Sequence, residues 1–248
     1  MRKPTLSRPP MDAVTSGRAL ETASPLNILR WAVDTFDSRL TFGTGFGAEE
    51  CVLIDLIGRH RLPIDLFALD TGLLFPETYT LWSQLEDRYE LTIRGARPSL
   101  TAEEQNRVYG RELWSHDPDR CCNIHKVTPL TAEFLRFDAW ITGIRRDQTI
   151  HRAHALAVEW DQEFGLSNVN PLVRWTKKDV WSHLLSHEVP YNPLHDYGFP
   201  SSGYHPCTSR VSDGEDDRAG RWRGCATNES GLHSPVTPVE AVAASSPW

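Results

Sequence analysis

Three cysteines are the residues of this 248-residue chain that are best suited to chemistry. Cys121 and Cys122 are adjacent, and Cys207 lies further along the chain, close to His205. A disulfide between neighbouring cysteines is strained, so the pair is better suited to offer two thiolates to a third party. Thiolates are the ligands that zinc ions and iron–sulfur clusters prefer. The sequence therefore predicts a metal site with three cysteine ligands and either His205 or His125 as the fourth; the alternative is three reduced, buried thiols.

A glycine-rich turn at residues 43–47 is the second chemically informative feature. It has the sequence Gly-Thr-Gly-Phe-Gly and joins a strand-like segment, residues 39–42, to an expected helix, residues 48–60. Glycines let backbone N–H groups approach a phosphate at the N-terminus of a helix. The turn lacks both the glycine spacing of the dinucleotide fingerprint and the Lys-Ser/Thr ending of the common phosphate loop. It therefore predicts an anion cradle of another type.

Alternating strands and helices must position these groups. The expected strands are residues 39–42, 64–69, 91–93 and 139–142, and the expected helices are residues 27–36, 48–60, 76–89 and a segment that begins after Thr176. Such alternation predicts an α/β fold, a mostly parallel sheet with helices on both faces, followed by an irregular C-terminal segment. Ligands of such sheets bind beyond the carboxyl ends of the strands. The turns at residues 43–47, 70–72 and 143–149 should therefore meet at one cleft.

Charge and composition exclude several classes of protein. A formal net charge of −7 argues against a nucleic-acid binder, which usually carries a basic excess. No apolar run in the sequence reaches membrane-spanning length, so no membrane contact is expected. Five cysteines are too few for a secreted disulfide framework and fit a reducing cytoplasm. The oligomeric state stays open, a homo-oligomer included.

Several motifs, taken together, resemble the sulfonucleotide reductases, and specifically the iron–sulfur type that acts on adenosine 5′-phosphosulfate (APS). Phe46-Gly47-Ala48-Glu49 resembles the modified phosphate loop of that family, and Leu69-Asp70-Thr71-Gly72 resembles its adenosine-side turn. Similar motifs occur at residues 141–148, 158–161, 190–196 and 218–222. The resemblance covers roughly residues 40–233. It implies an adenine-nucleotide α-hydrolase-like fold and thioredoxin-dependent reduction of APS to sulfite and AMP.

The resemblance also implies a set of site residues. The substrate-binding residues are carried over from the matching motifs: Thr44, Phe46, Gly47, Ala48, Glu49, Leu69, Asp70, Thr71, Gly72, Lys126, Gly143, Arg145, Arg146, Arg152, Arg218 and Arg221. The arginines in this set carry guanidinium groups, which suit phosphate and sulfate oxygens, although the protein as a whole is acidic. Cys121, Cys122 and Cys207 are expected to bind a 4Fe–4S cluster, with His205 as a candidate fourth ligand.

The implied organisation has four parts. Residues 1–25 are expected to form a disordered leader, and residues 26–200 a sulfonucleotide-binding α/β domain. Residues 201–233 are expected to form a C-terminal segment that carries cluster and active-site residues. Residues 234–248 are expected to form a flexible tail.

Two positions depart from the family pattern. Tyr204 stands where the family has a cluster-binding cysteine, and Ser230 stands where the family has its nucleophile in a Glu-Cys-Gly-Leu-His ending, which His233 closes here. A serine hydroxyl is a far weaker nucleophile than a thiolate, and a sulfate ester on oxygen offers no sulfur–sulfur bond for exchange with thioredoxin. Cys225, five residues upstream, is the candidate substitute. The alternatives are a non-catalytic relative that binds APS or AMP, and an engineered substrate trap, which explains Ser230 but not Tyr204.

Overall fold

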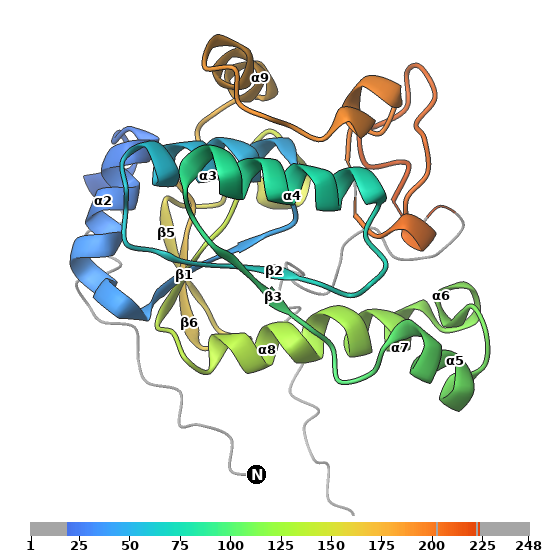
Figure 1. Cartoon of the computed structure of the whole chain (residues 1–248). Helices are drawn as coiled ribbons and strands as arrows, with labels where there is room; N and C mark the ends of the chain where they lie inside the picture. The colour runs from blue at the N-terminus through green and yellow to red at the C-terminus, as the bar shows by residue number, and fades with distance from the viewer. Residues whose placement is uncertain (1–18, 202, 222, 224–248) are drawn as a thin grey trace, which may run out of the picture.

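A six-stranded sheet forms the centre of the protein, with helices on both of its sides (Figure 1). The structure is a computed structural model that describes residues 19–201, 203–221 and 223. The strand order is β3-β2-β1-β4-β6-β5, and only β5 runs antiparallel to its neighbour. The predicted α/β class is therefore confirmed. Residues 1–18 and 234–248, together with Cys225, Ser230 and His233, lie outside the described residues.

The strands confirm most of the sequence-based prediction. They are β1 Leu40–Thr44, β2 Asp65–Leu69, β3 Ile93–Ala96, β4 Ala139–Ile141, β5 Val158–Asp161 and β6 Leu166–Val169. β1 pairs in parallel with both β2 and β4, so Phe42 lies opposite Leu66 on one side and Ile141 on the other. Strand β3 begins later than residues 91–93 suggested, and the hairpin formed by β5 and β6 was not predicted as a pair of strands.

The long helices also confirm the prediction. They are α2 Pro25–Phe36, α3 Ala48–Arg59, α4 Pro76–Tyr89 and α9 Lys177–Ser186. Thr176 caps α9 in a capping box with Asp179, whose backbone N–H donates to the threonine hydroxyl at 3.2 Å. Residues 51–57 of α3 are all buried, because this helix is covered by the sheet on one side and by α9 on the other.

Short helices fill the stretch between β3 and β4, where no helix was predicted. They are α5 Ala102–Tyr109, α6 Leu113–His116, α7 Pro118–Cys122, the π-helical turn η2 Asn123–Val127 and α8 Thr128–Phe134. Further short turns of 3-10 helix are η1 Asp37–Arg39, η3 Ile150–Arg152, η4 Pro193–Tyr197 and η5 His205–Cys207. In Figure 1, α8 and α7 lie on the side of the sheet opposite α3 and α4.

Two apolar clusters cover the two faces of the sheet. The larger joins residues of α2, α3, α4 and α9 to the sheet, including Leu29, Leu53 and Leu184. The smaller joins Phe134 of α8 to Trp140 of β4 and other residues on the far face. No helix among the described residues is long and apolar enough to span a membrane.

The end of the expected leader is structured, which corrects the prediction for residues 19–25. The backbone N–H of Ala157 and the guanidinium of Arg146 donate to the carboxylate of Glu21, at 2.9 and 2.6 Å. The Ser24 hydroxyl then caps α2 by accepting from the backbone N–H of Asn27 at 3.3 Å. These contacts attach the start of the described chain to the loop before β5.

A buried carboxylate joins three helices. Asp55 of α3 is fully buried, accepts a hydrogen bond from the hydroxyl of Tyr89 at 2.8 Å, and forms a second with Nε2 of His183 at 2.8 Å. Burial opposes ionisation of Asp55, but the hydrogen bonds from His183 and Tyr89 outweigh it, and its pKa lies below the ordinary value. The ionised carboxylate therefore fixes α4 and α9 against α3.

We expect Asp55→Ala to lower the free energy of unfolding by about 3 kcal/mol, because it leaves buried polar partners unpaired. Urea unfolding measures the loss. Because the folded pKa is depressed, the contribution of Asp55 is present above its unfolded pKa of about 3.9 and is lost as the pH falls through the folded value. The matched control is Asp138→Ala, which removes an exposed ion pair with Arg39 and should cost under about 1 kcal/mol. Equal losses in the two variants would contradict this account.

Candidate active site

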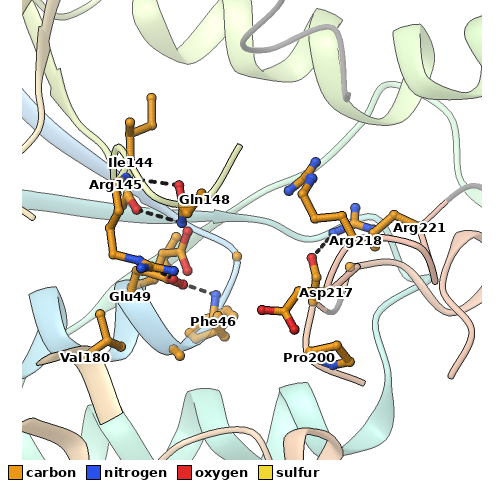
Figure 2. Close-up of a pocket in the computed structure, with 18 of the residues that line it drawn as sticks. Phe46, Glu49, Ile144, Arg145, Gln148, Val180, Pro200, Asp217, Arg218 and Arg221 are labelled. Carbon is orange, nitrogen blue, oxygen red and sulfur yellow. Dashed lines mark hydrogen bonds and ion pairs between the residues drawn. The ribbon is translucent and has the colours of Figure 1, made fainter. Parts of the chain in front are cut away.

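A cleft of about 690 Å³ opens beyond the carboxyl ends of the central strands. Its walls include the glycine-rich turn 43–47, the first turn of α3, the loop after β4 at residues 143–148, and the C-terminal segment at residues 216–221. The predicted convergence of the turns after β1 and β4 is therefore observed. Figure 2 shows the two walls of this cleft, with Glu49 and Arg145 on one side and Arg218 and Arg221 on the other.

The glycine-rich turn has a defined local structure. The backbone N–H of Phe46 donates to the hydroxyl of Thr44 at 3.0 Å, and Phe46 adopts a left-handed conformation with φ of 60°. This conformation is unfavourable for a residue with a side chain, so other contacts must hold it. The buried ring of Phe46 packs beside Trp82 with ring centroids 5.3 Å apart. The packing of this buried ring holds the turn in place, and residues 43–47 of the turn line the cleft.

Arg145 joins the two loops that form one wall. Its Nε donates to Oε1 of Glu49 at 2.9 Å, and the two side chains lie side by side in Figure 2. Its guanidinium also pairs with Asp147. The side-chain amide oxygen of Gln148 accepts from the backbone N–H of Arg145 at 3.0 Å and from Arg152 at 2.6 Å. The residues expected to bind substrate that line the cleft are Thr44, Phe46, Gly47, Ala48, Glu49, Leu69, Lys126, Gly143, Arg145, Arg152, Arg218 and Arg221.

Four suggested residues are placed elsewhere. Arg146 points toward the N-terminal segment, where it pairs with Glu21, and it does not line the cleft. Asp70, Thr71 and Gly72 follow β2 but are also absent from the lining. Asp70 instead accepts from the hydroxyl of Tyr79 at 2.8 Å. Burial and this bond raise the pKa of Tyr79 to about 12, so the phenol stays protonated.

The opposite wall carries two arginines, Arg218 and Arg221, beside two carboxylates, Asp216 and Asp217. Burial, followed by repulsion from Arg218, lowers the pKa of Arg221 to about 10. A bound anion between the two arginines and the glycine-rich turn would offset that effect. Lys126 also lines this part of the cleft, is buried, and has a pKa lowered mainly by burial.

Sequence reasoning missed several residues of the cleft, among them His195 and Glu50. His195 lines it, and both ring nitrogens are buried without a hydrogen-bond partner among the described residues. Burial lowers the pKa of His195, so the ring is neutral. Glu50 lines the cleft as well, one position beyond the matching loop motif. The match at residues 190–196 already contained His195, so that motif was the available signal; Glu50 had none.

The three cysteines meet at a second, much smaller cavity. Its lining includes Cys121, Cys122, Cys207 and His125, and its volume is about 10 Å³. We call it the thiol cavity. Burial, followed by the neighbouring Cys207 and Cys122, raises the pKa of Cys121 to about 12. The sequence prediction that Cys207 joins the tandem pair is consistent with this shared lining.

Tyr204 lines the thiol cavity together with the three cysteines. The Lys126 ammonium lies over the tyrosine ring, 4.3 Å from its centroid, and both residues line the thiol cavity and the cleft. Burial raises the pKa of Tyr204, so its hydroxyl is neutral. The two side chains therefore form a shared wall between the two cavities.

The donors and the space of the thiol cavity do not fit an intact 4Fe–4S cluster. A volume of about 10 Å³ holds one water molecule, and a neutral phenol is a poor ligand for cluster iron. Within the described part of the chain, no group of three or more His, Cys, Asp or Glu side chains is arranged to hold a metal ion. His205 is not placed to be the fourth ligand, because it is exposed and does not line the cavity. Its ring packs 5.0 Å from that of Phe75 instead.

Three comparisons relate this chain to known proteins. Residues 39–210 match the model of the family described as phosphoadenosine phosphosulfate reductase domain. An adenosine 5′-phosphosulfate reductase of Halalkalibacterium halodurans is 42% identical over 217 residues, which cover 87% of this chain and 94% of that protein. Adenosine 5′-phosphosulfate reductase 2 of Bacillus subtilis is 43% identical over 209 residues, 84% of this chain and 89% of that protein.

A solved structure shares the fold. The phosphoadenylyl-sulfate reductase from Candida auris, crystallised as a phosphate complex, superposes with a TM-score of 0.73. It is 31% identical, and the match covers 83% of this chain and 98% of that chain.

Arg152 and Arg146 should behave differently when replaced. We expect Arg152→Gln to weaken AMP binding about tenfold, because Arg152 lines the cleft and a hydrogen bond to a charged group is worth about 1.5 kcal/mol or more. Arg146→Gln should leave AMP affinity unchanged and lower the thermal midpoint instead, because it removes the pair with Glu21. Isothermal titration and thermal melting measure the two effects. A loss of affinity in Arg146→Gln equal to that in Arg152→Gln would contradict the placement.

Proposed function

The chain belongs to the phosphoadenosine phosphosulfate reductase domain family, and on this premise we propose that it is an oxidoreductase that reduces APS to sulfite and AMP in sulfate assimilation. The observation that carries the proposal is the geometry of the cleft. An anion cradle at the glycine-rich turn faces Arg218 and Arg221 across the cleft, and Lys126 connects the cleft to the thiol cavity. This arrangement suits a ligand with two linked anionic groups.

APS is the proposed substrate, rather than its 3′-phosphorylated relative. The relatives from Halalkalibacterium halodurans and Bacillus subtilis are named for APS, at 42% and 43% identity. The Candida auris structure is named for the phosphorylated compound, at a lower identity of 31%. The three cysteines of the thiol cavity, which resemble those of the APS-specific type, also favour APS.

The proposed chemistry needs a thiolate. Its sulfur attacks the sulfate sulfur of APS, the bond from that sulfur to the bridging oxygen breaks, and AMP leaves with the electron pair. The S-sulfonated cysteine is then reduced by an external dithiol. One thiolate of that dithiol, for which we propose thioredoxin, joins the cysteine sulfur and expels sulfite; its second thiol completes a disulfide and restores the cysteine. The substrate sulfur gains two electrons, and the dithiol loses two.

Cys225 is the proposed nucleophile, since Ser230 occupies the family position. Both residues lie outside the described part of the structure, so this assignment rests on the sequence. The second candidate function follows from the same substitution. If Cys225 does not react, the protein is a sulfonucleotide-binding relative whose cleft retains its arginines.

The cofactor of the thiol cavity is part of the proposal. The resemblance implies a 4Fe–4S cluster held by Cys121, Cys122 and Cys207, but Tyr204 and the small volume do not fit that cluster as the side chains are placed. We therefore derive no step of the reaction through it. A structural zinc ion and three metal-free thiols are the alternatives. We also propose a cytoplasmic location, because free thiols and thioredoxin belong to reducing compartments.

The activity is tested by sulfite release from APS with thioredoxin and its reductant. We expect sulfite release from the anaerobically purified protein and, without reductant, an added mass of one sulfonate group on the intact chain. Cys225→Ala should abolish both. The control is Cys51→Ala, which removes a buried thiol whose pKa burial holds well above its ordinary value, and it should retain the adduct. Retained APS binding without sulfite or adduct would select the non-catalytic alternative.

The role of Tyr204 is tested by restoring the family residue. After anaerobic reconstitution with iron and sulfide, we expect the native chain to retain far fewer than about four irons, and Tyr204→Cys to approach that number. Tyr204→Phe keeps the ring and should behave like the native chain. Iron and acid-labile sulfide analysis measures the difference. Full cluster loading of the native chain would show that Tyr204 moves aside.

A further inference from the structure

The carboxylate of Glu50 lies in the anion cradle itself. A methyl group on Gly47 would lie 2.5 Å from Oε2 of Glu50, and one on Gly143 would lie 3.2 Å from Oε1. The carboxylate is therefore held between two glycines that both line the cleft. The backbone N–H groups of Gly47 and of Glu50 itself, where α3 begins, act to lower the pKa of this carboxyl group. Such N–H groups are the donors that a helix N-terminus presents to a bound anion.

We propose that Glu50 is an internal anion that occupies the cradle of the free protein and must be neutralised or displaced when a ligand anion binds. This inference rests on the proposed function, because it assigns a regulatory role within the same cleft. The ligand it concerns is a phosphate or sulfate group. The consequence is that binding of such a group is coupled to uptake of a proton.

The surroundings of Glu50 make this coupling effective near neutral pH. Burial, followed by repulsion from Glu49, raises the pKa of Glu50 to about 7, and Arg152 on η3 opposes the shift. Arg145 is paired with Glu49, so its charge is already engaged on that side. Burial lowers the pKa of His195 on η4, and the nearby charge of Glu49 offsets only part of that effect. Glu50 is thus an acidic group of this wall whose pKa is raised to about 7.

The sign of the pH dependence follows from these placements. Below pH 7 the carboxyl is protonated, carries no charge and does not repel an incoming anion. Above pH 7 it is ionised and competes for the same N–H donors. Anion affinity should therefore be highest on the acid side and fall as the pH rises, by about tenfold between pH 6 and pH 8 if the ionised form blocks binding.

An ordinary helix-capping role predicts a different result for a substitution of Glu50. A carboxylate in the first turn of a helix stabilises the helix N-terminus, so its removal would only lower stability. Under the present proposal, removal of the charge also improves anion binding. A pH profile of affinity separates the two roles, because helix capping alone leaves it unchanged.

The test uses inorganic sulfate, whose charge is constant between pH 6 and pH 8, titrated calorimetrically at fixed ionic strength. We expect the sulfate affinity of the native chain to fall about tenfold over this range. Glu50→Gln should bind sulfate with the same affinity at every pH and, at pH 8, about tenfold more tightly than the native chain. Glu90→Gln, which changes an acid outside the cleft lining, should follow the native profile.

Three results would overturn the proposal: a flat profile in the native chain, an unchanged slope in Glu50→Gln, or no sulfate binding by the native chain at any pH. The first and third need no variant, so misfolding of Glu50→Gln leaves the test intact. The proposed function is judged separately, by APS binding and sulfite release. Failure of APS to bind while sulfate shows the expected profile would reject the function and keep the cradle.

Discussion

The parallel pairing of β1 with both β2 and β4 is the constraint on which the cleft depends. It places the carboxyl ends of β1 and β4 side by side, so the glycine-rich turn and the loop that carries Arg145 face each other. The ion pair between Glu49 and Arg145, 2.9 Å long with both side chains largely buried, then links the two loops. Residues far apart in sequence meet on this wall because the register of three short strands brings them together.

The C-terminal segment reaches the cleft by a separate route. Isolated antiparallel bridges pair Tyr204 with Leu74 and Thr208 with Arg221, and they connect the segment that carries Arg221 to the chain that follows β2. Gly203 lies against the guanidinium of Arg221, which would have to move to admit a side chain at this position. The same path brings Cys207 to the tandem cysteines at the end of α7. The cleft and the thiol cavity therefore both depend on the path of this C-terminal segment.

Much of this fold could be predicted from sequence, and the failures have physical reasons. Apolar runs such as residues 64–69 identify strands because a central parallel strand is buried on both faces. The short helices of residues 102–134 were missed because each is too brief to show a repeating pattern. Arg145 and Arg146 could not be distinguished, since partners distant in sequence, Glu49 and Glu21, decide which of them enters the cleft. Glu50 was missed because its position between two glycines exists only in three dimensions.

The shared wall of Lys126 and Tyr204 has a thermodynamic consequence. Because both side chains line both cavities, whatever fills one cavity changes the shape and the potential of the other. Such an influence is reciprocal: a nucleotide that alters the affinity of the thiols for a metal must have its own affinity altered by that metal by the same factor. Binding at one cavity and binding at the other are thus parts of one linked equilibrium. A dissociation constant measured for either cavity holds only for a stated occupancy of its neighbour.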